Sequence, residues 1–343
     1  MANASTPRVS MVVTNHNYGR YVERAIDGLL AQSFTALEVI VVDDRSTDDS
    51  ATVLRRYEAD PRVRLVFHTR NEGSISSYNQ GLAMARGEFV GVFDADDYSL
   101  SEHAIARQVA MFDANPDVGF VYSSFVIVDE HGVPFRESKP WPHDRVREGL
   151  DAFADLVGLN TVPHSGTLVR SSAHRAVGYY DPHLPYAGDW DLWLRLSARF
   201  SVGYISDPLY AYRVHRNNMT SKGKAPGEAT RERQQAVANG FAALPASAPP
   251  ALRALREPAM RNALLTGTWN DRSFGRTRRS WEGLIDAVRR SPGLLLHADA
   301  YGAFARLSLL TLLGHRRYER LAAWRERRGV PSRSVPAASR VYR

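Results

Sequence analysis

The chain of 343 residues is 44% hydrophobic and 24% charged, as expected for a water-soluble globular protein with one large domain or two. It has no cysteine, which excludes a disulfide framework and thiolate metal sites. The first seven residues are mostly polar, so we do not expect an export signal. No apolar run reaches about 18 residues, so we do not expect a membrane span.

The formal charge of +7 is unevenly distributed along the chain. Residues 1–224 contain 23 Lys and Arg against 28 Asp and Glu, which gives −5. Residues 225–343 contain 21 Arg against 9 acidic residues, which gives +12. An acidic first part and a basic second part indicate two surfaces with different partners.

Short apolar runs alternate with amphipathic stretches along the first part of the chain. The expected strands are residues 8–14, 37–42, 63–67, 87–93 and 118–128, and the expected helices are residues 21–32, 46–57, 74–86 and 103–115. We expect Ser46 to cap the second of these helices. Alternation with short links predicts an α/β protein whose parallel sheet carries helices on both faces.

The rest of the chain is first irregular and then all-helical. Residues 130–132 predict a hairpin turn and residues 139–147 an exposed loop; further helices are expected at residues 150–159 and 189–200, and strands at residues 168–170, 202–205 and 209–213. Helices are then expected at residues 228–243, 250–270, 276–290 and 294–328. The polar loop between them predicts two domains, an α/β domain at residues 1–224 and a basic α-helical region at residues 225–343.

Three polar clusters follow expected strands at the point where each strand ends. They are Asn15–Tyr18, Asp43–Asp44 and Asp94–Asp97. In open α/β sheets, ligands bind beyond the carboxyl ends of the strands. Two like charges about 4 Å apart cost about 4 kcal/mol at an effective dielectric constant near 20, so the three carboxylates of the last cluster predict a cation. Because these ligands are oxygen atoms, the cation would be Mg²⁺ or Mn²⁺. In the alternative interpretation there is no cation site: one Asp caps the next helix and the others are solvated.

Several motifs in one order carry a resemblance to a known family. They are residues 12–17 (VVTNHN), 41–48 (VVDDRSTD), 71–73 (NEG), 85–88 (ARGE), 93–97 (FDADD), 188–195 (GDWDLWLR) and 212–215 (YRVH). Together they resemble the family 2 glycosyltransferases, inverting enzymes with the GT-A fold. The resemblance covers about residues 8–218, so it implies a Rossmann-like, mostly parallel sheet there and leaves the helical C-terminal extension unassigned.

The resemblance implies a binding site for a nucleotide. Asp44 would accept a hydrogen bond from the base, His16 would stack on it, and Asp94 would hold the ribose. Arg213 would hold the diphosphate, which suits its planar guanidinium. The remaining nucleotide-binding positions would be Thr14, Asn17 and Asn71.

The resemblance also implies a metal and a general base. Asp96 and His215 would bind Mn²⁺ or Mg²⁺, and Asp189 would take the proton of the acceptor hydroxyl in a single displacement. A placed base typically contributes about 10²–10⁴-fold. The donor or acceptor sugar would contact Ser165, Gly166, Thr167, Gly188 and Trp190.

Three positions depart from the family pattern. His16 stands where the family usually has a tyrosine, which leaves the preferred nucleotide open. Gly188 stands where an acidic residue usually precedes the base, and Tyr78 stands where an arginine usually precedes Asn79. The last two departures keep a second function open, a non-catalytic nucleotide-sugar-binding or membrane-peripheral scaffold with the same fold.

The expected partners follow from the same resemblance and from the charge. They are a UDP- or dTDP-sugar donor and a glycan or lipid-linked acceptor of bacterial surface glycan assembly. We expect a cytoplasmic protein, peripheral at the inner face of the cell membrane if the basic helices bind anionic lipid; these helices can equally well only pack on the catalytic domain. Nucleic acid is not expected, because the first part is acidic and lacks a nucleic-acid-binding motif. The chain also lacks the glycine-rich signatures of nicotinamide-binding Rossmann enzymes and P-loop NTPases.

Overall fold

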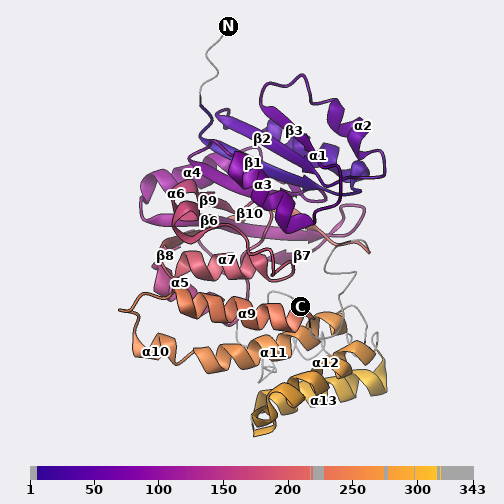
Figure 1. The fold of residues 1–343 in the computed structure, drawn as a ribbon, viewed down its shortest axis with the longest axis vertical. Coiled ribbons are helices and arrows are strands. Elements are labelled where there is room, and N and C mark those ends of the chain that lie inside the picture. Colours follow the sequence, from indigo (N-terminus) through magenta and orange to yellow (C-terminus); the bar gives the residue numbers. More distant parts are fainter. Residues whose placement is uncertain are drawn as a thin grey trace.

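The protein combines one mixed β-sheet with helices on both of its faces and a stack of further helices on one side (Figure 1). The computed structural model describes residues 6–216, 218, 228–273, 277–296, 298–314 and 317. Within these residues, no helix is both long enough and apolar enough to cross a membrane.

The sheet contains ten strands in the order β3-β2-β1-β4-β9-β6-β10-β5, with β7 paired to β6 and β8 paired to β10. The strands are β1 (Val9–Asn15), β2 (Leu37–Asp43), β3 (Val63–Phe67), β4 (Phe89–Asp94), β5 (Tyr98–Ser99), β6 (Val118–Val128), β7 (Pro134–Ser138), β8 (Arg145–Arg147), β9 (Leu168–Arg170) and β10 (Ser201–Arg213). The predicted α/β class is confirmed.

Four short strands, β5, β7, β8 and β9, run antiparallel to their partners and make the sheet mixed. Strands β3, β2, β1 and β4 are parallel, as are β6 and β10, but β9 runs antiparallel between β4 and β6. Leu168 at the start of β9 pairs with Gly91, and Arg170 at its end pairs with Phe89. Because β9 runs in the opposite direction to β4, the residues that precede it lie along the carboxyl end of β4.

Helices cover both faces of the sheet, and the later ones stack on one side of it (Figure 1). They are α1 (Gly19–Leu30), α2 (Ser50–Arg55), α3 (Ser74–Met84), α4 (Ala104–Ala114), α5 (Gly149–Leu156), α6 (Ser171–Val177), α7 (Gly188–Ser197), α9 (Glu228–Ala243), α10 (Pro250–Arg253), α11 (Arg256–Ser273), α12 (Thr277–Arg290), the 3₁₀ helix η1 (Pro292–Leu296) and α13 (Ala298–Leu313). On β1, Met11 and Val13 pack with α1, α2 and α4, whereas Val12 packs with α3, α5 and α7. This alternation follows from the two-residue period of a strand.

Three local expectations were wrong. Helix α2 begins at Ser50, and the Ser46 hydroxyl instead donates to Asp43 Oδ1 at 2.6 Å. The loop expected at residues 139–147 contains β8. The two strands expected at residues 202–205 and 209–213 are one strand, β10, with register shifts on both sides of Pro208. Proline has no N–H to donate, so a strand accommodates it at such a bulge.

The first helices of the C-terminal region share the core of the sheet. Val237 and Phe241 of α9 lie in one cluster with Trp193 of α7, and a Cβ at Gly240 would lie 2.8 Å from Leu194 Cβ. A second cluster joins Leu264 and Leu265, in the middle of α11, with α12, η1 and α13. The division at residue 224 stays a prediction, and the core continues across it. The last expected helix, residues 294–328, is divided into η1 and α13, and residues 318–328 lie outside the described part.

Helix α9 also contacts the segment that leads into α7. Glu232 Oε2 accepts hydrogen bonds from the backbone N–H groups of Tyr186, at 2.5 Å, and Ala187, at 3.2 Å. On α7 itself, Asp191 accepts from the side chain of Asn239 at 2.7 Å. The position of α7 therefore depends on α9.

Candidate active site

The carboxyl ends of β1, β2 and β4 bring the polar clusters side by side. Thr14 pairs with Asp94, and Asn15 pairs with Asp43. The backbone N–H of Asp44 donates to the Asn15 carbonyl at 2.8 Å. Thr14, Asp44 and Asp94 therefore lie at the same edge of the sheet, where a ligand of an open α/β sheet is expected.

The Asp44 carboxylate organises the loop between β3 and α3. Its Oδ1 accepts from the backbone N–H of Glu72 at 2.7 Å, and its Oδ2 accepts from that of Gly73 at 2.8 Å. His68 Nδ1 lies 2.9 Å from Oδ1. A carboxylate oxygen has two lone-pair sites, so Oδ2 retains one acceptor site for a ligand.

His16 and Asn71 form the more exposed part of this edge. The His16 Nδ1–H donates to the Asp44 carbonyl at 2.7 Å, which places the proton on Nδ1 because a carbonyl only accepts. Asn71 Nδ2 lies 3.3 Å from both ring nitrogens of His16. Asn17 has φ 60° and accepts from the Thr47 N–H at 2.7 Å, so its side chain fixes the turn after β1.

Asp94 is held by three side chains. Tyr78 Oη donates to Oδ1 at 2.8 Å, and His164 Nδ1 and Ser165 Oγ lie 3.1 Å from Oδ2. Burial works against ionisation of this carboxyl, but the charge of His164 and these hydrogen bonds lower the pKa of Asp94 below its ordinary value. These contacts therefore favour the ionised form of Asp94.

Asp96 and Asp97 are almost completely buried, at 5% and 2% exposed. Asp96 Oδ2 lies 2.9 Å from both His215 Nε2 and Asn218 Nδ2, and Asp97 Oδ1 accepts from the backbone N–H of Arg213 at 2.9 Å. Burial and the neighbouring carboxylates raise the pKa of Asp96 and raise that of Asp97 well above the ordinary value. A cation would relieve this crowding of negative charge.

The donor atoms of Asp96 and His215 fit a divalent metal. Oδ2 of Asp96 and Nε2 of His215 lie 2.9 Å apart, within hydrogen-bond distance, and a carboxylate oxygen with an imidazole nitrogen is a donor set that would suit Mn²⁺ or Mg²⁺. The described part of the chain contains no group of three or more His, Asp or Glu side chains that could hold a metal. Mg²⁺ usually takes one or two carboxylates, water and substrate phosphates, so two protein ligands are compatible with it.

Asp189 lies in the first turn of α7. Its Oδ2 accepts from Asn160 Nδ2 at 2.8 Å, and its Oδ1 accepts from the Trp190 N–H at 2.7 Å. Burial raises the pKa of Asp189, although the charge of His164 opposes this shift. The charges of Asp94 and Asp189 both raise the pKa of His164, so this imidazole interacts with carboxylates of both β4 and α7.

Sequence reasoning did not identify the aromatic side chains that surround His164. Its ring centroid is 4.7 Å from that of Tyr78 and 5.4 Å from that of Tyr180, and the two tyrosines are 5.5 Å apart. Asn79 joins this group by donating to the Tyr180 carbonyl at 2.8 Å. The spacing of Ile75, Tyr78 and Leu82 on α3 was the available signal, because it puts Tyr78 on the face toward the sheet.

Replacing His164 by alanine is expected to weaken donor binding and to change stability with pH. The carboxylate of Asp94 raises the pKa of His164 although burial lowers it. The imidazolium therefore stabilises the fold below its unfolded pKa, and this contribution is lost as the pH rises through the folded pKa. The Tm difference between wild type and His164→Ala should be larger at pH 6 than at pH 9. An equal difference at both pH values would contradict the charged pairing.

Two residues expected at the sugar are core residues. Trp190 is 5% exposed, and its indole N–H donates to the Leu156 carbonyl at 2.8 Å within the core of α5 and α7. Thr167 is 1% exposed, and its hydroxyl donates to the Pro163 carbonyl at 2.6 Å. Helix α7 turns Trp190 inward and β9 begins immediately after Thr167, so these contacts give the predicted sugar contacts of both residues no support, and they stay predictions. Ser165 lies next to Asp94, with its Oγ 3.1 Å from Oδ2, and Gly188 directly precedes Asp189.

Arg213 donates hydrogen bonds to the backbone next to the acidic cluster. Its Nε donates to the Asp96 carbonyl at 2.8 Å and its Nη1 to the Glu130 carbonyl at 3.1 Å. The guanidinium carbon lies 4.6 Å from the ring centroid of Tyr21 and 5.2 Å from that of Tyr98. These contacts favour a positioning role for Arg213 and leave its predicted contact with a diphosphate without structural support.

Gly166 is required by packing. It has φ +80°, and a Cβ there would lie 2.4 Å from the ring of Tyr210. That ring is fixed, since Tyr210 Oη donates to Gln108 Oε1 at 2.8 Å. The ring of Tyr210 therefore accounts for glycine at position 166, and the predicted contact of Gly166 with the sugar stays a prediction.

The substitution Gly166→Ala is expected to lower the free energy of unfolding by about 1–3 kcal/mol, because it adds both backbone strain and overpacking. Urea unfolding measures this change. Gly158→Ala is a matched control, since the nearest atom to a Cβ at Gly158 is 4.0 Å away. Equal losses for the two variants would contradict the packing explanation.

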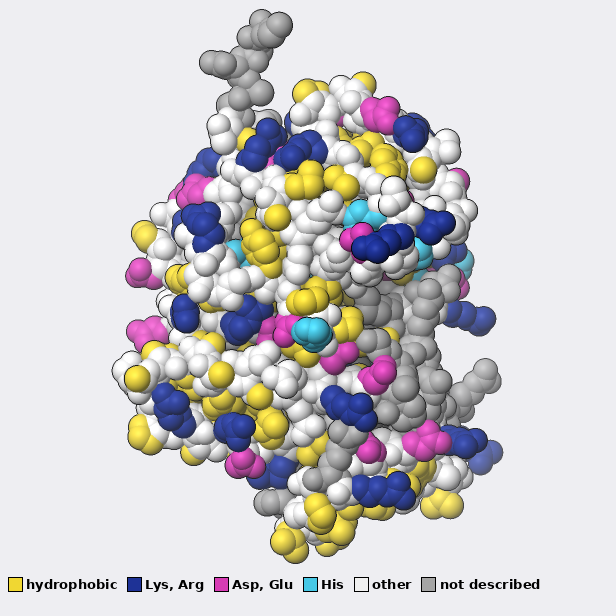
Figure 2. Space-filling view, viewed as in Figure 1, with side chains coloured by type: hydrophobic (Ala, Val, Ile, Leu, Met, Phe, Trp, Pro, Cys, Tyr) yellow, Lys and Arg dark blue, Asp and Glu magenta, His cyan; other side chains and the backbone are white. Residues whose placement is uncertain are grey.

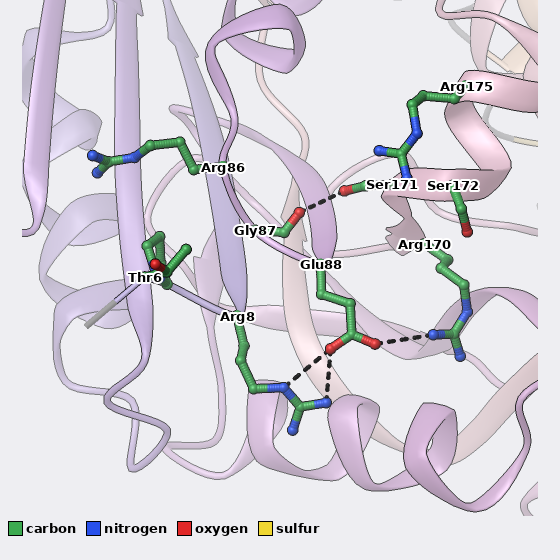
Figure 3. Close-up of a pocket in the computed structure, with 10 residues that line it drawn as sticks. Thr6, Arg8, Arg86, Gly87, Glu88, Arg170, Ser171, Ser172 and Arg175 are labelled. Carbon is green, nitrogen blue, oxygen red and sulfur yellow. Dashed lines mark hydrogen bonds and ion pairs between the residues drawn. The ribbon is translucent and has the colours of Figure 1, made fainter.

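A cavity of about 540 Å³ lies at the opposite, amino-terminal edge of β1 and β4 (Figure 3). Three of its four arginines are engaged with carboxylates: Arg8 Nη2 lies 2.9 Å from Glu88 Oε2, Arg170 Nη1 lies 3.1 Å from Glu88 Oε1, and Arg86 Nη2 lies 2.7 Å from Glu38 Oε2. These ion pairs join β1, β4 and β9, so the cavity is distinct from the catalytic candidates.

Comparison with known proteins agrees with this geometry. Residues 10–178 match the sequence model of Glycosyl transferase family 2. An uncharacterised glycosyltransferase from Nostoc sp. is 28% identical over 241 residues, which cover 67% of this chain and 72% of the relative. Chondroitin synthase from Escherichia coli is 27% identical over 217 residues, which cover 63% of this chain and 30% of that protein.

Solved structures show the same fold. S. aureus TarS 1–349 in complex with UDP-GlcNAc superimposes with a TM-score of 0.66 at 18% identity and covers 91% of this chain and 92% of that chain. The mannosyltransferase PcManGT from Pyrobaculum calidifontis, in complex with GDP-Man and Mn²⁺, has a TM-score of 0.55 at 20% identity and covers 97% of this chain and 86% of that chain.

These matches confirm the GT-A fold and favour an enzyme over the non-catalytic scaffold. The chain therefore belongs to glycosyl transferase family 2 and is a glycosyltransferase.

Proposed function

We propose that this enzyme transfers a sugar from a nucleotide-sugar donor to an acceptor hydroxyl by a metal-assisted single displacement with inversion. The observation that carries the proposal is the arrangement of carboxylates at one edge of the sheet. Asp94 ends β4 and Asp96 follows it, Asp189 lies in the first turn of α7, and His164 Nδ1 lies 3.1 Å from Asp94 Oδ2 while the charge of Asp189 also acts on this imidazole. These groups would supply donor binding and a general base.

The nucleotide would bind along the ends of β1 and β2. Asp44 Oδ2 has an acceptor site for the imide N–H of uracil or thymine, which is why UDP- and dTDP-sugars are favoured. His16, beside Asn71, would stack on the base, and Asp94 would accept from the ribose. Asp96 and His215 would hold Mn²⁺ or Mg²⁺, which supplies charge stabilisation for the leaving diphosphate.

Asp189 would act as the general base. The acceptor oxygen forms a bond to the anomeric carbon while the bond from that carbon to the diphosphate oxygen breaks, and the electron pair leaves with the nucleoside diphosphate. The acceptor proton goes to the Asp189 carboxylate. Burial raises the pKa of this carboxyl, which makes it a better base than an ordinary aspartate.

The proposed classes of donor and acceptor are inferred from proteins similar to this chain. TarS is solved with UDP-GlcNAc and PcManGT with GDP-Man and Mn²⁺, so UDP-GlcNAc is the first donor to test and GDP-Man the rival. The relation to chondroitin synthase supports a glycan acceptor, and a lipid-linked glycan has the same reacting hydroxyl. Bacterial surface glycan assembly is the proposed setting.

A thermal-shift screen tests donor binding. UDP-, dTDP- and GDP-sugars are each added with and without Mn²⁺, and a ligand that binds only the folded protein raises Tm according to its occupancy. We expect the largest shift with a UDP- or dTDP-sugar together with Mn²⁺. No shift with any donor would overturn the proposal. Proton NMR of the glycosylated product then gives the anomeric configuration, and retention would overturn the single displacement.

A further inference from the structure

Exposed hydrophobic side chains are concentrated at the C-terminal end of the described chain. Five of the eleven large hydrophobic side chains that are exposed in the described residues belong to α12, η1 and α13. We call these five the C-terminal apolar surface: Ile285, Leu295, Leu296, Tyr301 and Leu312. Leu296 and Leu312 are 86% and 81% exposed, so neighbouring described residues hardly cover them.

Helix α13 has a buried apolar side and an exposed face without charged residues. Leu307 and Leu310 are buried against α11 and α12. On the exposed side, Tyr301, Ala305, Ser308 and Leu312 follow at intervals of four, three and four residues and therefore share one face. None of these four side chains is charged. A surface helix normally carries charged residues on its outer face, so this face is suited to a partner that is itself apolar.

The C-terminal region is rich in positive charge. On α12, the exposed Arg289 lies four residues after Ile285 and on the same face, and Arg278, seven residues before Ile285, is paired with Glu282 at 2.9 Å. The sequence that follows α13, residues 315–343, contains nine Arg and two Glu. In Figure 2, hydrophobic side chains gather at the lower end of the molecule, over α12 and α13, with Lys and Arg nearby.

We propose that the C-terminal apolar surface binds an anionic lipid membrane. Its apolar side chains would enter the interface between headgroups and acyl chains, and the arginines would contact the anionic headgroups. Each basic residue near such a surface contributes about fivefold in affinity. A second copy of the chain fits less well, because two regions that each carry +12 would repel one another. This binding does not depend on the transfer reaction.

Vesicle flotation tests the proposal with the full chain. The protein is mixed with vesicles of phosphatidylglycerol and phosphatidylethanolamine or with vesicles of phosphatidylcholine alone. We expect flotation with the anionic vesicles, a loss with increasing salt, and none with phosphatidylcholine. Leu296→Asp and Leu312→Asp should each reduce the bound fraction at least tenfold. Phe135→Asp in β7 is the matched control, since Phe135 is 58% exposed and lies outside the C-terminal apolar surface.

Three results would overturn the proposal. The first is no flotation with anionic vesicles, and the second is an equal loss in Phe135→Asp. The third is a fall in Tm for Leu312→Asp with unchanged flotation, which would mean that the protein itself covers this surface, either through residues 315–343 or through a second copy. Light scattering distinguishes these two, because only a second copy gives a dimer that the variant dissociates. Donor-induced thermal shifts should be unaffected in every variant, so this test is independent of the proposed transfer.

Discussion

Replacing Asp189 by asparagine is expected to reduce sugar transfer by about 10²–10⁴-fold, which is the usual contribution of a placed general base. Asparagine keeps the size of the side chain and can still pair with Asn160, which donates to Asp189 Oδ2 at 2.8 Å. Donor binding should be nearly unchanged, because the nucleotide would lie along β1, β2 and β4. A single-turnover assay together with the donor thermal shift separates the two effects.

Stability provides an internal check on this variant. Burial raises the folded-state pKa of Asp189, so the ionised carboxylate costs stability above that pKa and the neutral form does not. Asp189→Asn should therefore unfold at the same temperature as wild type or at a higher one. Asp191→Asn, two residues further along α7, should retain transfer because Asp191 pairs with Arg195 at 2.7 Å. Equal loss of transfer in both variants would indicate damage to the helix instead of loss of a base.

Replacing Asp96 by asparagine is expected to abolish the metal-dependent part of donor binding. A catalytic metal contributes several kcal/mol, so transfer should fall at least about 100-fold. The effect of Mn²⁺ on the donor thermal shift should disappear, since Asp96 would supply the only carboxylate ligand. The measurements are a Mn²⁺ titration of the Tm with the donor present and an initial-rate assay.

Asp97→Asn is the matched control for this prediction. Asp97 is next to Asp96, but burial and the charge of Asp96 raise its pKa well above the ordinary value, so the neutral amide resembles its preferred state. An amide oxygen can also still accept from the Arg213 N–H, which donates to Asp97 at 2.9 Å. We expect a loss of transfer of at most about tenfold. The metal assignment would be wrong if Asp97→Asn lost the Mn²⁺ effect and Asp96→Asn retained it.

The sequence allowed prediction of features that depend on local patterns. Apolar runs and helical spacing located β1 to β4 and the helices between them, and acidic residues directly after β4 indicated the edge where Asp94 and Asp96 lie. The motif resemblance added Asp189 and His215, which no local pattern connects with that edge. The positions of Asp94 and Asp96 follow from the direction of the chain in a parallel sheet. Those of Asp189 and His215 follow from the fixed order of the family's motifs.

Features that depend on distant pairing could not be predicted. The strand at residues 168–170 was predicted, but its antiparallel insertion between β4 and β6 is decided by the finished sheet. This insertion brings His164 and Ser165 to Asp94. The burial of Trp190 depended in the same way on α5, whose Leu156 carbonyl accepts its indole N–H. An aromatic residue beside a base has the same sequence pattern whether it faces a sugar or a core.

The contacts of Glu232 limit how this enzyme can be divided or recombined. The family match ends at residue 178, before Asp189, His215 and α9. Through its two hydrogen bonds to Tyr186 and Ala187, α9 fixes the segment that presents Asp189. A chimera that exchanges C-terminal regions between relatives therefore has to keep α9 with its own catalytic part. An exchange beyond α11 would cut through the cluster that Leu264 and Leu265 of α11 form with α12, η1 and α13. The helices from α9 to α13 are therefore expected to be inherited together with the sheet they pack on.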